Sequence, residues 1–139
     1  MNKLITLIAA GAVAAALTGT ASAHHSAVQF DFTKQVPIKG VVTHFRAINP
    51  HMQLTLRVND AKGEHLVEFE GHSTNNMYRN GYRKGMVNEG DIITVNVAPL
   101  KNGGEGGYVV SADLAGGTHF GMVSRSLDAA KIQQQAEGK

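Results

Sequence analysis

Strict alternation of apolar and polar residues from Met52 to Val58 is the feature that most limits what this chain can fold into. A period of two is typical of a β-strand that buries one face. The turn-forming letters DAKG follow soon after, and HLVEFEG then repeats the alternation. Pairing Leu54 with Phe69 gives the two strands one shared apolar face, whereas a shift of one residue would set Leu54 against Glu70. The pattern therefore predicts a β-hairpin in a single register.

The segments around this hairpin predict the rest of a small barrel. The β-branched run from Val36 to Phe45 favours a strand with a bend or bulge at Gly40, and two more strands begin at Ile92 and Tyr108. The letters STNNMYRNG have capping residues in front and glycine behind, which predicts a short helix after the hairpin. The order β-β-β-α-β-β matches the OB-fold. We therefore predict a mainly β fold, a five-stranded OB-like barrel with one short helix.

The first 23 residues have the composition of a secretory signal. Lys3 precedes an apolar stretch, and Ala21-Ser22-Ala23 is the small-residue pattern that signal peptidase recognises. Cleavage after Ala23 would deliver a periplasmic or secreted protein, and no later segment is apolar for long enough to insert into a membrane. We assign residues 1–23 to the signal peptide, 24–35 to an N-terminal arm, 36–115 to the barrel, and 116–139 to a C-terminal tail that contains a candidate helix.

Composition argues against several classes of function. The chain has no cysteine, which excludes disulfides, thiolate metal sites and thiol catalysis. Loss of Lys3 with the signal leaves 12 basic and 11 acidic side chains, and this balance, with only three tyrosines and five phenylalanines, does not suit nucleic acid. No phosphate-binding loop, hydrolase elbow or His-Glu-x-x-His motif occurs. We expect a monomer that binds a small ligand or a partner protein and is not an enzyme.

Three of the seven histidines are candidate metal ligands. His24 would carry the free α-amine of the processed chain, which can join its own imidazole in chelating copper. The hairpin register places His51 directly opposite His72 on the outer face, at a spacing suited to two imidazoles on one ion. Copper(II) or zinc held by these three residues is our most specific hypothesis. The alternates for further ligand positions are His25, His44 and Glu70.

Two other interpretations of the same residues stay open. In the first, the histidines only support local structure, with His51 capping a turn and His72 assisting the start of the helix. In the second, a metal-free OB module binds a partner protein, a peptide or a saccharide through its rim loops, Arg46–Pro50 and Pro99–Gly107. The remaining histidines, which we expect to be solvated, are His65 and His119.

The ordered motifs of the chain resemble those of a known family. HHS, FD, IKGVVTHF, NPH, EFEG, RNGY and EGDIITV occur in this order between His24 and Leu114. The set is similar to that of a family of small exported bacterial proteins catalogued only as a domain of unknown function. The family pattern usually has tryptophan at three places, where this chain has Ala47, Val67 and Tyr82. The resemblance implies export and a compact β domain, and it brings no established activity, cofactor or partner.

Overall fold

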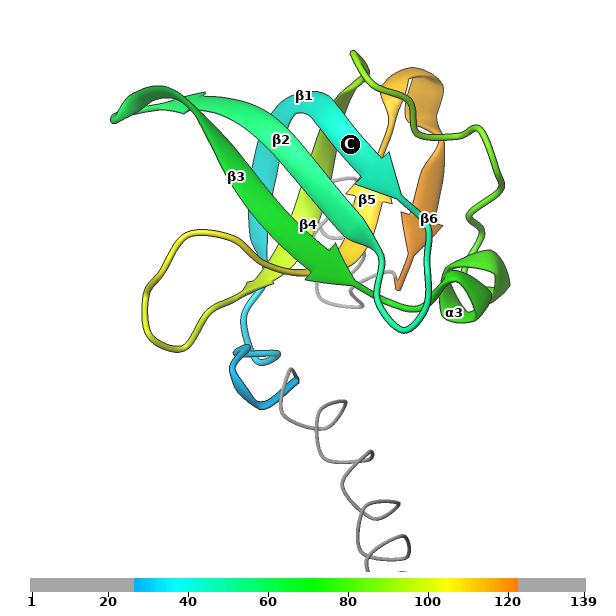
Figure 1. The fold of residues 1–139 in the computed structure, drawn as a ribbon, viewed down its shortest axis with the longest axis horizontal. Coiled ribbons are helices and arrows are strands. Elements are labelled where there is room, and N and C mark those ends of the chain that lie inside the picture. The colour runs from blue at the N-terminus through cyan, green and yellow to red at the C-terminus, as the bar shows by residue number, and fades with distance from the viewer. Residues whose placement is uncertain (1–26, 123–139) are drawn as a thin grey trace, which may run out of the picture.

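The computed structural model describes residues 27–122, which form a β-barrel with one short α-helix (Figure 1). The strands are β1 (Val36–Arg46), β2 (Gln53–Asp60), β3 (Gly63–Gly71), β4 (Ile92–Pro99), β5 (Gly107–Asp113) and β6 (His119–Gly121). The helix α3 (Thr74–Arg79) lies between β3 and β4, and a 3₁₀ turn, η1 (Ala115–Gly117), precedes β6. This order confirms the predicted mainly β, OB-like architecture.

Five strands close into a mixed barrel. Antiparallel neighbours follow the order β3-β2-β1-β4-β5-β6, and a parallel pairing of β3 with β5 closes the ring. In this pairing Glu70 lies beside Tyr108, and Gly71 lies beside Val109. The closure therefore brings the outer face of β3 next to the outer face of β5.

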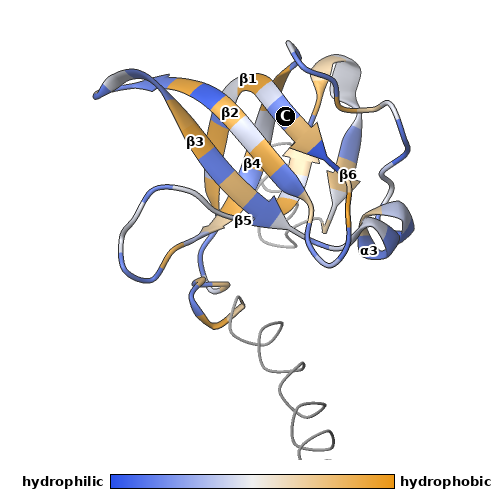
Figure 2. Ribbon diagram, viewed as in Figure 1, coloured by the Kyte–Doolittle hydropathy of each residue, from blue (hydrophilic) through white to orange (hydrophobic). Residues whose placement is uncertain are grey.

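The hairpin of β2 and β3 has the predicted register. Leu54 pairs with Phe69 and Leu56 pairs with Val67, and all four side chains are buried. Figure 2 shows the resulting bands of apolar and polar residues along both strands. The register is fixed because a shift of one residue would turn every buried side chain of one strand to solvent.

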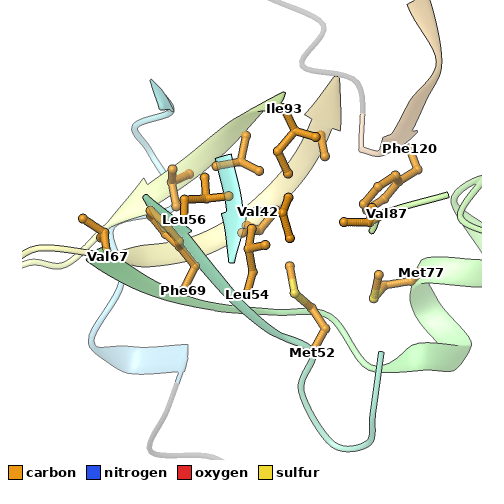
Figure 3. Packing of buried hydrophobic residues seen from close by; sticks show 14 of the residues in the cluster. Val42, Met52, Leu54, Leu56, Val67, Phe69, Met77, Val87, Ile93 and Phe120 are labelled. Atoms are coloured by element: carbon orange, nitrogen blue, oxygen red, sulfur yellow. The ribbon is translucent and has the colours of Figure 1, made fainter. Parts of the chain in front are cut away.

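The core fills the barrel and extends to α3. Figure 3 shows Met52, Met77 and Phe120 at the end of the core nearest this helix, and Val67 at the opposite end. All four side chains are buried. The helix begins after Ser73, whose hydroxyl oxygen accepts a hydrogen bond from the backbone N–H of Asn76 at 3.4 Å. The short helix therefore lies where the sequence predicts it and contributes Met77 to the core.

The bend in β1 lies where the strand changes partners. Residues 36–41 of β1 pair with β4, and residues 41–46 pair with β2. A bulge between Val42 and His44 shifts the register, so the bulge follows Gly40 instead of coinciding with it. Gly40 itself lies at a close approach, because a Cβ there would meet Arg57 O at 2.9 Å.

A sixth strand lies within the segment assigned to the C-terminal tail. β6 pairs with β5 through Ala112 and Phe120, and the Phe120 side chain is buried in the core. The predicted signal peptide, His24, His25 and the candidate terminal helix lie outside the described residues. Within residues 27–122, no helix has the length and apolar character that crossing a membrane would require.

Candidate functional site

His51 and His72 lie together at the open end of the β2–β3 hairpin. The ladder continues past β2, since the Met52 N–H donates to the His72 carbonyl at 3.0 Å and the Gly71 N–H donates to the Met52 carbonyl at 3.2 Å. Both imidazoles meet the ring of Tyr108, with centroid distances of 6.3 Å for His51 and 5.1 Å for His72. Tyr108 belongs to β5 and reaches both histidines because β5 pairs with β3.

Hydrogen bonds orient the two imidazoles. His51 Nδ1–H donates to the Gly71 carbonyl at 3.1 Å, so the neutral ring carries its lone pair on Nε2. A hydrogen bond of 3.1 Å joins His72 Nδ1 to the Tyr108 hydroxyl. His72 Nε2 is buried and has no hydrogen-bond partner within residues 27–122. Buried polar atoms usually have a hydrogen-bond partner, so this ring nitrogen is a candidate ligand atom.

Burial sets the protonation of this cluster. It lowers the pKa of His72 below the ordinary 6.5, and the neighbouring His51 lowers that pKa further. It also raises the pKa of Tyr108 above 10.0, with the carboxylate of Glu70 as the second cause. At neutral pH His72 is therefore a neutral imidazole, which is the form that binds metal ions, and Tyr108 keeps its proton.

The N-terminal arm also packs against Tyr108. Phe30 is only 4% exposed, and its ring centroid lies 5.5 Å from that of Tyr108. The Asp31 N–H donates to the Pro99 carbonyl at 2.8 Å, and the Lys101 N–H donates to the Gln29 carbonyl at 2.9 Å. The described part of the arm is thus held against the outside of the barrel beside β4 and β5. The aromatic residues on either side of Asp31 were the only sequence signal for this contact.

His44 lies apart from the histidine pair. It is exposed on β1, and its Nδ1 lies 3.9 Å from Glu89 Oε1. Across residues 27–122, no group of three or more histidine, aspartate and glutamate side chains is placed to hold a metal ion. The structure therefore brings together two of the predicted ligands, His51 and His72, while His24 and His25 lie outside the described residues.

A cleft of about 430 Å³ opens on the outer face of β2 and β3. Its floor includes outward side chains of both strands, among them Gln53, Glu68 and Glu70. Phe30 of the arm lines one wall, and Leu100 lines another at the start of the loop between β4 and β5. Of the two predicted rim loops, only Pro99–Gly107 borders this cleft. Glu70 joins the cleft to the Tyr108 cluster, since it lines the cleft and lies beside Tyr108.

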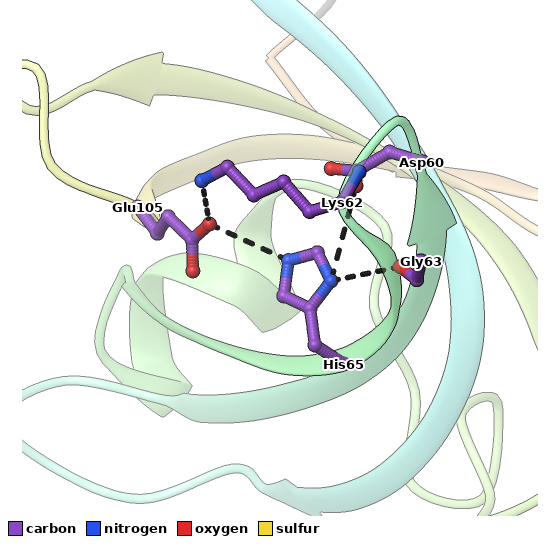
Figure 4. Close-up of polar contacts among 5 residues, drawn as sticks. All are labelled: Asp60, Lys62, Gly63, His65 and Glu105. Atoms are coloured by element: carbon purple, nitrogen blue, oxygen red, sulfur yellow. Dashed lines mark hydrogen bonds and ion pairs between the residues drawn. The ribbon is translucent and has the colours of Figure 1, made fainter.

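His65 and His119, which were expected to be solvated, are both half-buried. His65 pairs with Val58 on the inward side of the hairpin, and its side chain is 24% exposed. Figure 4 shows it between Asp60, Gly63 and Glu105. His119 donates from Nδ1 to Asp113 Oδ1 at 2.7 Å. Extending the predicted register by two residues would have placed His65 on the inner face.

Comparison with known proteins identifies the family of the chain. A search of curated proteins found no match. The model of a protein family described as a family of unknown function, DUF6152, matches residues 12–109. The match includes the hairpin, α3 and the start of β5, and it agrees with the resemblance seen in the ordered motifs. The chain therefore belongs to the DUF6152 family of unknown function.

Proposed function

We propose that this protein is exported and binds copper(II) or zinc through His51, His72 and the N-terminal His24. The observation that carries the proposal is the meeting of His51 and His72 at Tyr108, where His72 Nε2 is buried without a partner in the described part of the chain. Imidazole nitrogens suit both metals, which take three or four such ligands. The protein would act by holding the ion and would catalyse no reaction.

Supporting hydrogen bonds favour Nε2 as the ligand atom of both rings. Ligating histidines commonly donate their second ring N–H to a carbonyl or another fixed acceptor, which holds the ring and its tautomer. His51 has this arrangement, because its Nδ1–H donates to the Gly71 carbonyl. His72 acquires it when its Nδ1–H donates to the Tyr108 oxygen.

The packing of the arm on the barrel limits the distance between His24 and the histidine pair. His24 precedes Phe30 by six residues, and Phe30 packs directly on Tyr108. An extended chain of six residues spans roughly 20 Å at most, so a processed N-terminus would stay near the histidine pair. His25 is the alternate in the arm. His44 is a poorer alternate, since it lies on β1 and its ring is close to Glu89.

Titration of the mature protein, beginning at His24, tests the proposal. Copper(II) and zinc binding are measured by calorimetry, and copper coordination by electron paramagnetic resonance. We expect one ion per chain, with affinity reduced about 100-fold or more by His51→Ala with His72→Ala, and also by one extra alanine before His24. His119→Ala is the matched control, since His119 bonds Asp113 and lies outside the proposed ligand set, and it should leave the affinity unchanged. Unaltered binding in the double variant would contradict the site.

A metal-free binding module is the second candidate, and the cleft on β2 and β3 favours it. The carboxylates of Glu68 and Glu70 line this cleft without forming an ion pair, and no lysine or arginine of the described chain lines it. Such a lining suits a basic peptide segment of a partner protein better than a saccharide. Under this candidate, Glu68→Gln weakens capture of a lysine-rich peptide while the histidine variants do not.

A further inference from the structure

The two ends of the barrel are filled differently. Figure 1 places α3 at one end and the loop between β4 and β5 at the other. Long or aromatic buried side chains, including Met77, Tyr82 and Phe120, fill the α3 end. At the opposite end the core finishes in short β-branched residues, Val58 and Val67. Within residues 27–122, large side chains therefore fill the α3 end, whereas the core at the opposite end consists of smaller ones.

A cavity of about 510 Å³ lies at the end of the barrel opposite α3. Its apolar wall is formed by Val36, Ile38, Val58, Val67 and Val97, which come from β1, β2, β3 and β4. Three of these, Val58, Val67 and Val97, belong to the buried core, so the cavity reaches the barrel interior. Barrel mouths with mainly apolar walls and a few convergent polar groups are common places for small ligands.

A polar rim crosses the mouth of this cavity. Lys62 Nζ donates to Glu105 Oε1, which also lies 3.5 Å from His65 Nε2 (Figure 4). The opposite side of the His65 ring donates from Nδ1 to the Gly63 carbonyl at 3.0 Å. These contacts tie the β2–β3 turn to the loop between β4 and β5. Because the hydrogen bond from Lys62 lowers the pKa of Glu105, this carboxylate stays ionised at neutral pH.

The loop is also held at its base. Gly106 has φ +91°, and a Cβ there would overlap the Glu68 carbonyl oxygen, so its backbone passes directly against β3. In the described part of the chain, Lys39, Asp60 and Glu105 line the cavity, and Lys62 pairs with Glu105, so two ammonium groups face two carboxylates. This balance favours neither an organic anion nor an organic cation, while the apolar wall favours a hydrophobic body.

We infer that the barrel mouth is a binding site for an uncharged small molecule with an apolar body and one polar end. The apolar part would enter between Val58, Val67 and Val97. The polar end would lie at the rim, within reach of His65 and Glu105. This site is separate from the histidine pair at Tyr108 and does not depend on metal binding.

Fluorescence titration with N-phenyl-1-naphthylamine tests this site, because the probe is uncharged and gains emission in apolar surroundings. Its anionic counterpart, 8-anilinonaphthalene-1-sulfonate, has the same rings and serves as the charge control. We expect saturable binding of one neutral probe per chain, at least about tenfold tighter than binding of the sulfonate. Absence of saturable binding, or equal affinity for the two probes, overturns the inference.

Variants locate the probe. Val36 is 44% exposed at the cavity, so Val36→Phe should fold normally and reduce the affinity about tenfold. Ile92→Phe is the matched control, since Ile92 is 57% exposed and lines neither this cavity nor the cleft. Val67→Phe should fill the cavity and abolish binding. Unchanged affinity in Val36→Phe overturns the site, whereas His51→Ala with His72→Ala should leave probe binding intact even if metal binding is lost.

Discussion

At the scale of single residues, the protonation of His72 makes the stability of the fold depend on pH. Its imidazole is shielded from water by the surrounding strands and by the ring of Tyr108, which lowers its pKa below 6.5. In the unfolded chain the same ring would protonate near its ordinary value. Below about pH 6.5 the unfolded state therefore takes up a proton more readily than the folded state, and stability falls as the pH decreases.

Replacing His72 with glutamine should flatten this dependence. We expect the wild-type protein to lose more stability than His72→Gln between about pH 7.5 and pH 5, because glutamine cannot take up the proton. Urea unfolding at the two pH values measures the difference. His44→Gln is the matched control for the same substitution at a histidine that is exposed on β1. Parallel stability curves for the wild type and His72→Gln would refute the assignment.

At the scale of elements, the bend of β1 allows one strand to join both neighbours. The strand leaves β4 and reaches β2 near Val41, just beyond Gly40. At Gly40 the backbone passes so close to β2 that a methyl group would lie 2.9 Å from Arg57 O and 3.0 Å from Leu56 Cβ. A side chain at this position would push the two strands apart.

Gly40→Ala should therefore destabilise the barrel by about 1–3 kcal/mol. Chemical denaturation gives the free energy of unfolding. Lys39→Ala changes the exposed neighbour on the same strand and is expected to shift stability by no more than about 0.5 kcal/mol. If the two variants had the same free energy of unfolding, the close approach at Gly40 would not contribute to stability.

The elements differ in how far the sequence predicts them. The β2–β3 hairpin is predictable in register because a shift would oppose Leu54 to Glu70, and this local rule is strict. β6 is three residues long, and one buried residue, Phe120, cannot establish a periodic pattern. The family model matches residues 12–109, which include the ordered motifs.

The candidate site was less predictable than the fold because most of its contacts join distant segments. Sequence spacing places His51 near His72, but it gives no indication that Tyr108 lies against both. That contact depends on the parallel closure of β3 on β5. His65 was missed for a different reason: it lies beside a turn, where side chains are usually solvated, although the register places it opposite Val58.

At the scale of the whole molecule, the arm and the barrel share one small apolar cluster. Phe30 packs with Ala98, Tyr108 and Val110, which lie on β4 and β5. This cluster is separate from the main core inside the barrel. Folding of the barrel and docking of the arm are therefore distinct contributions to stability that meet at Tyr108.

Phe30→Ala should release the arm. We expect a loss of about 3 kcal/mol and faster hydrogen exchange at the amides of Asp31 and Lys101, whose hydrogen bonds hold the arm to the barrel. Val28→Ala is the control, since Val28 is 66% exposed on the same arm and should cost less than about 1 kcal/mol. Undiminished protection at both amides in Phe30→Ala would show that the backbone contacts alone retain the arm.

The closure of β3 on β5 also bears on folding kinetics. Val36 of β1 pairs with Val97 of β4, and Phe69 of β3 pairs with Gly107 of β5. The pairings that complete the ring therefore join segments far apart in the chain. Topologies dominated by such pairings fold in milliseconds to seconds, more slowly than those built from local contacts. During synthesis the N-terminal part of the chain appears first, so the β2–β3 hairpin can form before Tyr108 has been added. Pairing of β5 with β3 closes the ring and places Tyr108 beside the two histidines in the same step.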